Sequence, residues 1–328
     1  MQTERTTLIG RNKKFLEMVG RIPLLSLCDA TVLITGETGT GKDLFARAVH
    51  YQSARKSKPF VPVNCAALPD HLVENELFGH SKGAFTDAGL DHRGLLAEAD
   101  GGTLFLDEIN SLGLLAQGKL LRFLQDREYR PLGSSKSRTS DVRIIAATNT
   151  DLKELVEQKL FRADLYHRLN ILSLHVPALR DRPEDIQTLT QHFLTLYGRQ
   201  YGRGDIACYG TALEKLLAYQ WPGNVRELQG VLQRAVILTN SQTLQSEDID
   251  LPVAQQSAIS EDGGFHEAKA EAIERFERAY LTEILAKHNG NVSQAAKTAK
   301  TERRSLQRML RKYGLDRCQF QQSVMKAY

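Results

Sequence analysis

Short apolar runs alternate with amphipathic stretches over the first half of the chain. Three of these runs, at 31–35, 102–106 and 142–146, carry few polar positions, and each is followed by a loop or helix signal. Strands that are apolar on both faces and separated by helices are typical of a parallel sheet covered on both sides. We therefore predict an α/β fold for residues 1–173.

The pattern changes after residue 173. Helical spacing covers 184–199, 211–220 and 225–239, so we expect a small helical subdomain over 174–250. A polar stretch rich in glycine and proline follows, which predicts a linker over 251–266. The remaining residues, 267–328, open with another helical pattern and are expected to form a separate domain.

A glycine-rich loop directly follows the first predicted strand and precedes a helical run. Its GxxxxGK spacing in this strand–loop–helix context predicts a P-loop rather than an ordinary glycine-rich turn. Backbone N–H groups of such a loop approach phosphate oxygens, the helix N-terminus adds a favourable dipole, and the lysine reaches the β- and γ-phosphates. The residues that we predict to bind ATP here are Gly36, Glu37, Thr38, Gly39, Thr40, Gly41, Lys42 and Asp43.

An acidic pair closes the second predicted strand. Asp107 would hold Mg²⁺, directly or through water, and Glu108 would orient or deprotonate the attacking water. Acidic pairs are common on solvated loops, but the preceding apolar strand and the upstream P-loop favour a Walker B element.

Overall composition excludes few classes of protein, whereas the local distribution of charge indicates a basic surface near the C-terminus. There is no run of about 18 apolar residues and no apolar N-terminal stretch, so neither a membrane span nor a signal peptide is expected. Four cysteines without CxxC spacing indicate reduced thiols in a cytoplasmic protein. The net charge is only +4, yet the segment 297–312 holds seven basic residues against one acidic residue.

That basic segment falls on two short predicted helices, 291–299 and 303–313. Leu306, Met309 and Leu310 would face a core, which leaves a basic outer face. This pattern predicts a helix-turn-helix whose second helix enters the major groove; a solvated basic helix is the alternative. The residues that we predict to contact DNA are Arg303, Arg304, Ser305, Gln307, Arg308, Arg311 and Lys312.

ATP chemistry does not explain the segment 83–88, which reads Gly-Ala-Phe-Thr-Asp-Ala. It resembles the GAFTGA loop of bacterial enhancer-binding proteins, the AAA+ activators of sigma-54 RNA polymerase. The resemblance implies that Phe85 and Thr86 contact sigma-54, and that the polar segment 131–140 is the second pore loop. Asp87 stands where the family has glycine. If the backbone there has positive φ, an aspartate adopts that conformation at a higher free-energy cost than glycine does.

The same resemblance extends over nearly the whole chain, from residue 8 to residue 315. It implies that Asn64, a turn residue by spacing alone, is a switch that holds the catalytic Glu108. Thr148 and Asn149 match sensor I, which reads the γ-phosphate. Arg162 and Arg168 match the family's arginine fingers, which act in trans on the nucleotide of the neighbouring subunit. Arg226 matches sensor II, which links the helical lid to the nucleotide. The C-terminal helices resemble a Fis-type DNA-binding domain.

The family implies an activator that binds enhancer DNA as a dimer, assembles into a hexameric ring and remodels the sigma-54 polymerase with ATP and Mg²⁺. No regulatory domain is expected before Leu8, so control would come from expression level, a regulatory protein in trans or an inhibitor of the ring. Asp87 leaves open a regulator independent of sigma-54, acting as a repressor or with another sigma factor. A helicase loader would lack the Phe-Thr loop, and an ATP-gated DNA-binding module would not need Arg162 and Arg168.

Overall fold

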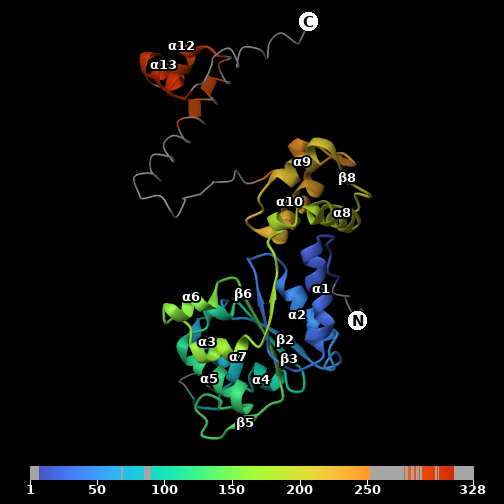
Figure 1. Cartoon of the computed structure of the whole chain (residues 1–328), viewed down its shortest axis with the longest axis vertical. Coiled ribbons are helices and arrows are strands. Elements are labelled where there is room, and N and C mark those ends of the chain that lie inside the picture. Colours follow the sequence, from blue (N-terminus) through green and yellow to red (C-terminus); the bar gives the residue numbers. More distant parts are fainter. Residues whose placement is uncertain are drawn as a thin grey trace. The chain divides into compact units, whose positions relative to one another are not determined.

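The chain forms two compact units, Met1–Pro252 and Val253–Tyr328, which are considered separately. The computed structural model (Figure 1) describes residues 7–67, 69–84, 90–251, 277, 280, 281, 284, 285, 288, 290–299, 301 and 303–313. The predicted linker after Leu251 and most of the helical pattern expected at the start of 267–328 lie outside these residues.

A five-stranded parallel sheet forms the centre of the first unit, in the order β2-β3-β6-β1-β7. The strands are β2 (Phe60–Asn64), β3 (Thr103–Asp107), β6 (Arg143–Thr148), β1 (Val32–Thr35) and β7 (Leu172–His175). The predicted α/β class is confirmed, and the three predicted strands are the three inner ones. Both edge strands escaped prediction, because Pro62 interrupts β2 and polar residues alternate with leucine along β7.

Helices cover both faces of this sheet, because successive side chains of each strand point to opposite sides. Val32 and Ile34 pack against α1 (Lys13–Ser26) and α2 (Lys42–Tyr51), whereas Leu33 joins the core of the opposite face. That second face is covered by α3 (Asp70–Phe78), α4 (Leu95–Glu98), α5 (Leu114–Asp126), α6 (Leu152–Glu157) and α7 (Ala163–Leu169).

Two short segments leave this domain from a shared base. His80 forms an antiparallel bridge with His92 and a parallel bridge with Leu132, and the Ser81 N–H donates to the Leu132 carbonyl at 2.9 Å. Beyond this base, β4 (Glu128–Tyr129) pairs with β5 (Arg138–Thr139). The segment predicted to contact sigma-54 and the predicted second loop are therefore joined by hydrogen bonds at their roots.

A helical subdomain completes the first unit and has its own core around the fully buried Trp221. The prediction of a helical subdomain is confirmed except for one small parallel pair, β8 with β9, that the spacing did not reveal. Its elements are η2 (Leu179–Asp181), α8 (Pro183–Gln200), β8 (Ala207–Cys208), α9 (Gly210–Ala218), α10 (Asn224–Leu238), β9 (Thr243–Leu244) and η3 (Ser246–Asp248).

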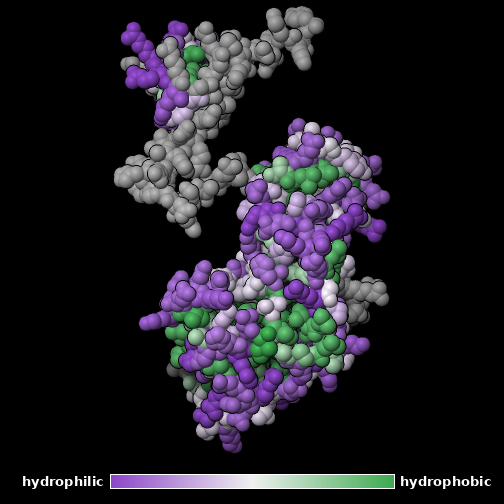
Figure 2. Space-filling view, viewed as in Figure 1, coloured by the Kyte–Doolittle hydropathy of each residue, from purple (hydrophilic) through white to green (hydrophobic). Residues whose placement is uncertain are grey.

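The surface of the first unit is mostly hydrophilic on the face shown in Figure 2, with apolar areas between. Large exposed apolar side chains include Leu27 and Leu115, which are 81% and 80% exposed. None of the described helices has the length and apolar character needed to cross a membrane.

The second unit holds α12 (Val292–Thr298) and α13 (Arg303–Lys312). The Asn291 side chain caps α12 by accepting from the Ser293 and Gln294 N–H groups. Leu306 and Leu310 of α13 are buried against α12 and the preceding segment, as the sequence predicted, and Met309 packs at the edge of this core.

Candidate nucleotide site and DNA-binding module

The P-loop turns sharply between β1 and α2. Its three glycines have positive φ, 150° at Gly36, 78° at Gly39 and 94° at Gly41, a conformation that other residues adopt at a cost. A Cβ on Gly39 would lie 2.2 Å from the carbonyl oxygen of Gly223, so this glycine also permits close contact with the helical subdomain. The Lys42 Nζ donates to the carbonyls of Gly36 and Glu37, at 2.8 Å and 3.0 Å.

Acidic residues gather around Lys42. Burial lowers the pKa of its ammonium, whereas the charges of Asp107, Glu108 and Asp43 favour the protonated form and that of Arg226 opposes it. Burial also raises the pKa of Asp107, against the effect of the Glu108 N–H and of Lys42. The structure therefore brings the predicted Walker A, Walker B and sensor II residues into one electrostatic neighbourhood.

The carboxylates near the P-loop suit a Mg²⁺ ion that is held partly by the phosphates of the nucleotide. No group of three or more His, Cys, Asp or Glu that could hold a metal occurs among the described residues. Mg²⁺ commonly takes one or two carboxylates, several waters and substrate phosphates rather than an all-protein cage. Asp107, at the end of β3 beside the P-loop, fits this pattern.

Asn64 lies next to Asp107 because the two residues are in register at the ends of β2 and β3. Asn64 is the last residue of the edge strand β2, and a turn follows it directly, with the Ala67 N–H donating to the Asn64 carbonyl at 3.3 Å. Its side-chain oxygen accepts from the Ala66 N–H at 2.9 Å. Glu108, the residue after Asp107, has left-handed backbone with φ 53°. Its side chain therefore leaves the backbone in a different direction from that of a residue that continues the strand.

The predicted sensor I residues contact both neighbouring motifs. Asn149 Nδ2 donates to Thr38 Oγ1 of the P-loop at 2.9 Å. The buried Thr148 hydroxyl donates to Asn110 Oδ1, at 3.0 Å, in the short helix η1 (Ile109–Ser111) after Glu108. Asn110 was not predicted; its position three residues after the first acidic residue of the pair is the signal that could have identified it.

The helical subdomain docks on the P-loop through a buried asparagine. Asn224 has φ 52° and no exposed surface; its Nδ2 donates to the Thr38 carbonyl at 3.0 Å and to Glu37 Oε2 at 3.1 Å. Its Oδ1 accepts from the Leu179 N–H at 2.7 Å. Arg180 adds a bidentate ion pair with Glu37, one bond of which is 2.8 Å.

This contact contains both a predicted residue and missed ones. The Arg226 N–H donates to the Gly39 carbonyl at 3.2 Å, which places the predicted sensor II residue at the P-loop. Neither Asn224 nor Arg180 was predicted. An asparagine directly after Pro-Gly, where left-handed backbone is common, is a signal for the first; the sequence holds no such signal for the second.

Arg162 directly precedes α7 and Arg168 lies on it, and their described contacts do not reach the P-loop of their own chain. Arg162 Nε and Nη2 donate to the Asp164 carboxylate at 3.0 Å and 2.7 Å, and the side chain is exposed. Arg168 Nε and Nη2 approach the Leu124 carbonyl at 3.4 Å and 3.2 Å. Both arginines are therefore separate from the group of charges around Lys42.

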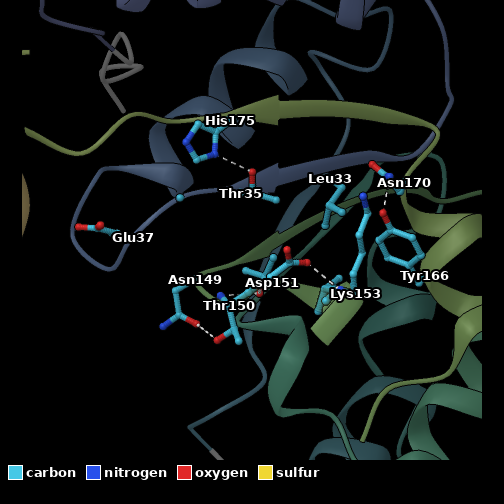
Figure 3. A pocket seen from close by; sticks show the side chains of 13 residues that line it. Leu33, Thr35, Glu37, Asn149, Thr150, Asp151, Lys153, Tyr166, Asn170 and His175 are labelled. Atoms are coloured by element: carbon cyan, nitrogen blue, oxygen red, sulfur yellow. Dashed lines mark hydrogen bonds between the residues drawn. The ribbon is translucent and has the colours of Figure 1, made fainter. Parts of the chain in front are cut away.

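A pocket of about 370 Å³ adjoins the P-loop on the α6–α7 side of the sheet (Figure 3). The His175 ring nitrogen and the Thr35 hydroxyl share a 3.0 Å hydrogen bond there, and Asn170 Nδ2 donates to the Tyr166 hydroxyl at 3.0 Å. Glu37 and Asn149 lie at its margin. The pocket connects the P-loop with α7, the helix that follows Arg162 and carries Arg168.

The residues predicted to contact sigma-54, Phe85 and Thr86, lie outside the described residues, as does Asp87. The described base ends at Ala84; Gly83 before it has φ 80°, and a Cβ added there would meet no atom within 4 Å. The base itself is held by bridges to His92 and Leu132.

The predicted DNA contacts lie mostly on the outer side of α13. Arg303, Arg304 and Arg308 are exposed, whereas Ser305 and Gln307 are half-buried. Lys312 is exposed and lies 3.5 Å from the Glu277 carboxylate. The side chain of Arg311 falls outside the described residues. α13 thus presents at least four of its predicted side chains to solvent on a helix whose opposite face is buried.

A P-loop fold with a helical lid and a separate helix-turn-helix defines a AAA+ ATPase domain joined to a DNA-binding module. Comparison with known families agrees: residues 8–175 match the Sigma-54 interaction domain, 180–263 the AAA+ ATPase lid domain and 272–313 the Fis family of bacterial regulatory proteins. The chain belongs to the family of proteins with the sigma-54 interaction domain.

Similar proteins include regulators and solved structures. The regulatory protein AtoC of Escherichia coli K12 is 44% identical over 296 residues, covering 89% of this chain and 64% of AtoC. GlrR of the same strain is 41% identical, covering 97% of this chain and 70% of GlrR. NtrX from Brucella abortus, solved in complex with ATP, is 32% identical with a TM-score of 0.71, covering 94% and 70%. The chain spans 44% to 64% of the length of four of the curated relatives it matches.

Proposed function

We propose that this protein is an ATP-hydrolysing transcription activator that binds enhancer DNA and remodels the sigma-54 RNA polymerase closed complex into an open complex. The observation that carries the proposal is the GAFTGA-like segment 83–88 on a AAA+ domain that matches the sigma-54 interaction family over residues 8–175. The Fis-type module supplies the DNA contact.

The nucleotide site supports hydrolysis by its arrangement of charges. Lys42 and the P-loop N–H groups would bind the phosphates, Asp107 would hold Mg²⁺, and Glu108 would activate water. Asn64 lies one strand from Asp107, so a change of its partner from Ala66 to Glu108 would make it the proposed switch. Three further residues would report the nucleotide state, namely Thr148, Asn149 and Arg226.

Arg162 and Arg168 are proposed to act on the nucleotide of a neighbouring subunit in a ring. Their contacts lie away from the P-loop of their own chain, and an arginine that neutralises the transferred phosphoryl group contributes about 10³-fold or more in rate. The apolar Leu114 and Leu115, which are 53% and 80% exposed at the start of α5, suit burial against another copy. These features support self-assembly, with a hexamer as the proposed form.

The loop movement would start from the shared base of the two segments. Because His80 pairs with both His92 and Leu132, a displacement of one root moves the other. Phe85 and Thr86 would contact sigma-54 at the tip, as the family resemblance implies.

The second unit is proposed to bind double-stranded DNA through α13, as a dimer on two half-sites. Its exposed arginines suit base edges and phosphates, and the buried Leu306 and Leu310 fix which face points outward.

The deciding experiment is ATP-dependent open-complex formation on a sigma-54 promoter, followed by the reactivity of unpaired thymines. We expect open complexes with the parent chain and none with Thr86→Ala, although Thr86→Ala should still hydrolyse ATP. Lys42→Ala should lose both activities. Active ATPase without open complexes at high protein concentration would overturn the sigma-54 role.

A second candidate, a regulator independent of sigma-54, is favoured by Asp87 alone, because it places a negative charge at the contact tip. Asp87→Gly separates the two functions. If only this variant opens the promoter, the natural chain has lost sigma-54 activation and keeps ATPase and DNA binding for another use.

A further inference from the structure

Gln117 is a polar residue at a core-facing position of α5. Its neighbours on this face are apolar, Ala116 and Leu120 among them, and Gln117 itself has no exposed surface. A buried amide is retained only where its hydrogen-bonding groups are satisfied, since an unpaired one is costly. Its partners therefore indicate what the residue does.

All of the amide's groups bind backbone of two separate loops. Nε2 donates to the Leu112 carbonyl at 2.7 Å and to the Leu160 carbonyl at 3.1 Å. Oε1 accepts from the Arg162 N–H at 2.9 Å. Leu112 ends the segment that begins at Glu108, and Arg162 is the residue directly before α7. One side chain thus joins the exit of the Walker B strand to the backbone of an arginine.

The connection continues to the nucleotide loop. Asn110, in the same Walker B segment, accepts from Thr148, and the adjacent Asn149 donates to Thr38 of the P-loop. A continuous series of hydrogen bonds and short backbone segments therefore runs from the P-loop, through sensor I and η1, to Gln117 and Arg162. The exposed guanidinium of Arg162 pairs with Asp164 two residues later, so the backbone anchor at Arg162 helps to position both side chains.

We propose that Gln117 is a positioning residue that fixes Arg162 for use on the neighbouring subunit's nucleotide and links it to the Walker B segment of its own chain. This inference rests on the proposed trans role of Arg162. The coupling then runs in one direction around the ring. The nucleotide bound by one subunit determines how that subunit positions Arg162 at the nucleotide of its neighbour. Gln117 serves the site of the neighbour and not the phosphates bound by its own P-loop.

Mixed rings test this direction. Glu108→Gln chains cannot hydrolyse ATP but keep Arg162, and Arg162→Ala chains can hydrolyse only with an arginine from a neighbour. Mixing the two should restore ATPase activity that neither has alone. Gln117→Met, which keeps an unbranched side chain of similar length, is then added to one partner at a time, with ADP affinity of each chain as the measure of an intact fold.

The expected result is asymmetric. Gln117→Met on the Glu108→Gln chain, which supplies the arginine, should lower the restored activity on the order of 10²-fold, because a small misplacement of a catalytic group is costly. The same change on the Arg162→Ala chain should lower the restored activity far less, because that chain offers no arginine and, on the Walker B side, loses only the bond to the Leu112 carbonyl. The side chain of Gln117→Asn is too short to reach both loops, so this variant should show the same asymmetry. It replaces Gln117→Met in the experiment if Gln117→Met fails to bind ADP.

Equal loss of activity from both positions would overturn the inference, because it indicates a general structural role, and so would full activity from both. Loss confined to the hydrolysing chain would likewise refute it, since Gln117 would then serve its own nucleotide. An inactive parent mixture would refute the trans role of Arg162 instead, and would be seen before any Gln117 variant is added.

Discussion

Left-handed backbone at non-glycine residues is concentrated near the nucleotide site. Of the five such residues in the described parts, Glu108, Trp221 and Asn224 belong to the Walker B segment and the lid contact. Each costs about 1 kcal/mol or more relative to ordinary backbone, so its surroundings must impose it. The Trp221 indole N–H donates to the Leu216 carbonyl at 2.9 Å, which is one such constraint.

Two substitutions of Asn224 should separate its hydrogen bonds from its backbone conformation. Asn224→Gly tolerates the left-handed φ but leaves the Leu179 N–H without its hydrogen-bond acceptor. It should lower the free energy of unfolding by about 1–3 kcal/mol. Asn224→Ala adds roughly 1 kcal/mol of backbone strain. Chemical denaturation checks both; equal stability of the two variants would contradict the assigned strain.

Glu37 should make the lid contact sensitive to acid. Hydrogen bonds from Arg180 hold its pKa below the ordinary 4.5, partly offset by burial and assisted by Asn224. Because the folded-state pKa is depressed, this contribution to stability is present above pH 4.5 and is lost as pH falls through the folded-state value.

Glu37→Gln should therefore be less stable than the parent at pH 7, and the difference should shrink on acidification. Thermal unfolding at a series of pH values from 7 to about 3.5 measures it. Glu214→Gln, on the exposed side of α9, is the matched control and should show no such convergence. A gap that stays constant over this range would refute the assignment.

At the scale of elements, α13 combines a buried and a basic face, which predicts two kinds of substitution effect. Arg308→Ala should lower affinity for a footprinted site by about 1–3 kcal/mol and relax its specificity. Lys312→Ala should weaken binding to all duplexes alike and lower the salt slope by about one. Fluorescence anisotropy on a footprinted and a random duplex, over a range of salt, distinguishes them.

The control for these variants is Arg234→Ala, which removes an exposed arginine from the lid helix α10 and should change neither quantity. If Arg308→Ala and Lys312→Ala behave identically on both duplexes, α13 contacts phosphates only and does not read bases.

Elements differ in how far the sequence revealed them. β1, β3 and β6 were predictable because both faces are buried, which leaves a continuous apolar run. β2 and β7 are edge strands, where Pro62 and His175 are tolerated and the pattern weakens. The strand that ends at Asn64 was not recognised for this reason.

At the scale of the molecule, the division into two compact units predicts separable activities. A chain ending at Pro252 should keep ATPase activity, because the P-loop, lid and α7 all lie before that residue. It should lose enhancer binding, and open-complex formation should need on the order of 10²-fold more protein, because tethering to DNA no longer raises local concentration. Titration of both chains on one promoter measures the shift; identical titrations would contradict it.

The sequence by itself determined the P-loop, the acidic pair, the three inner strands and the basic helix, because each depends on local spacing or a continuous apolar run. It also revealed the segment 83–88, whose role rests on the family resemblance. Only the tertiary structure decided which segments meet: Asn224 and Arg180 at the P-loop, Asn110 at sensor I, and Gln117 between Leu112 and Arg162. Apart from the bond between Gln117 and Leu112, these contacts join residues 38 to 186 positions apart, and no local pattern encodes a hydrogen bond across such a distance.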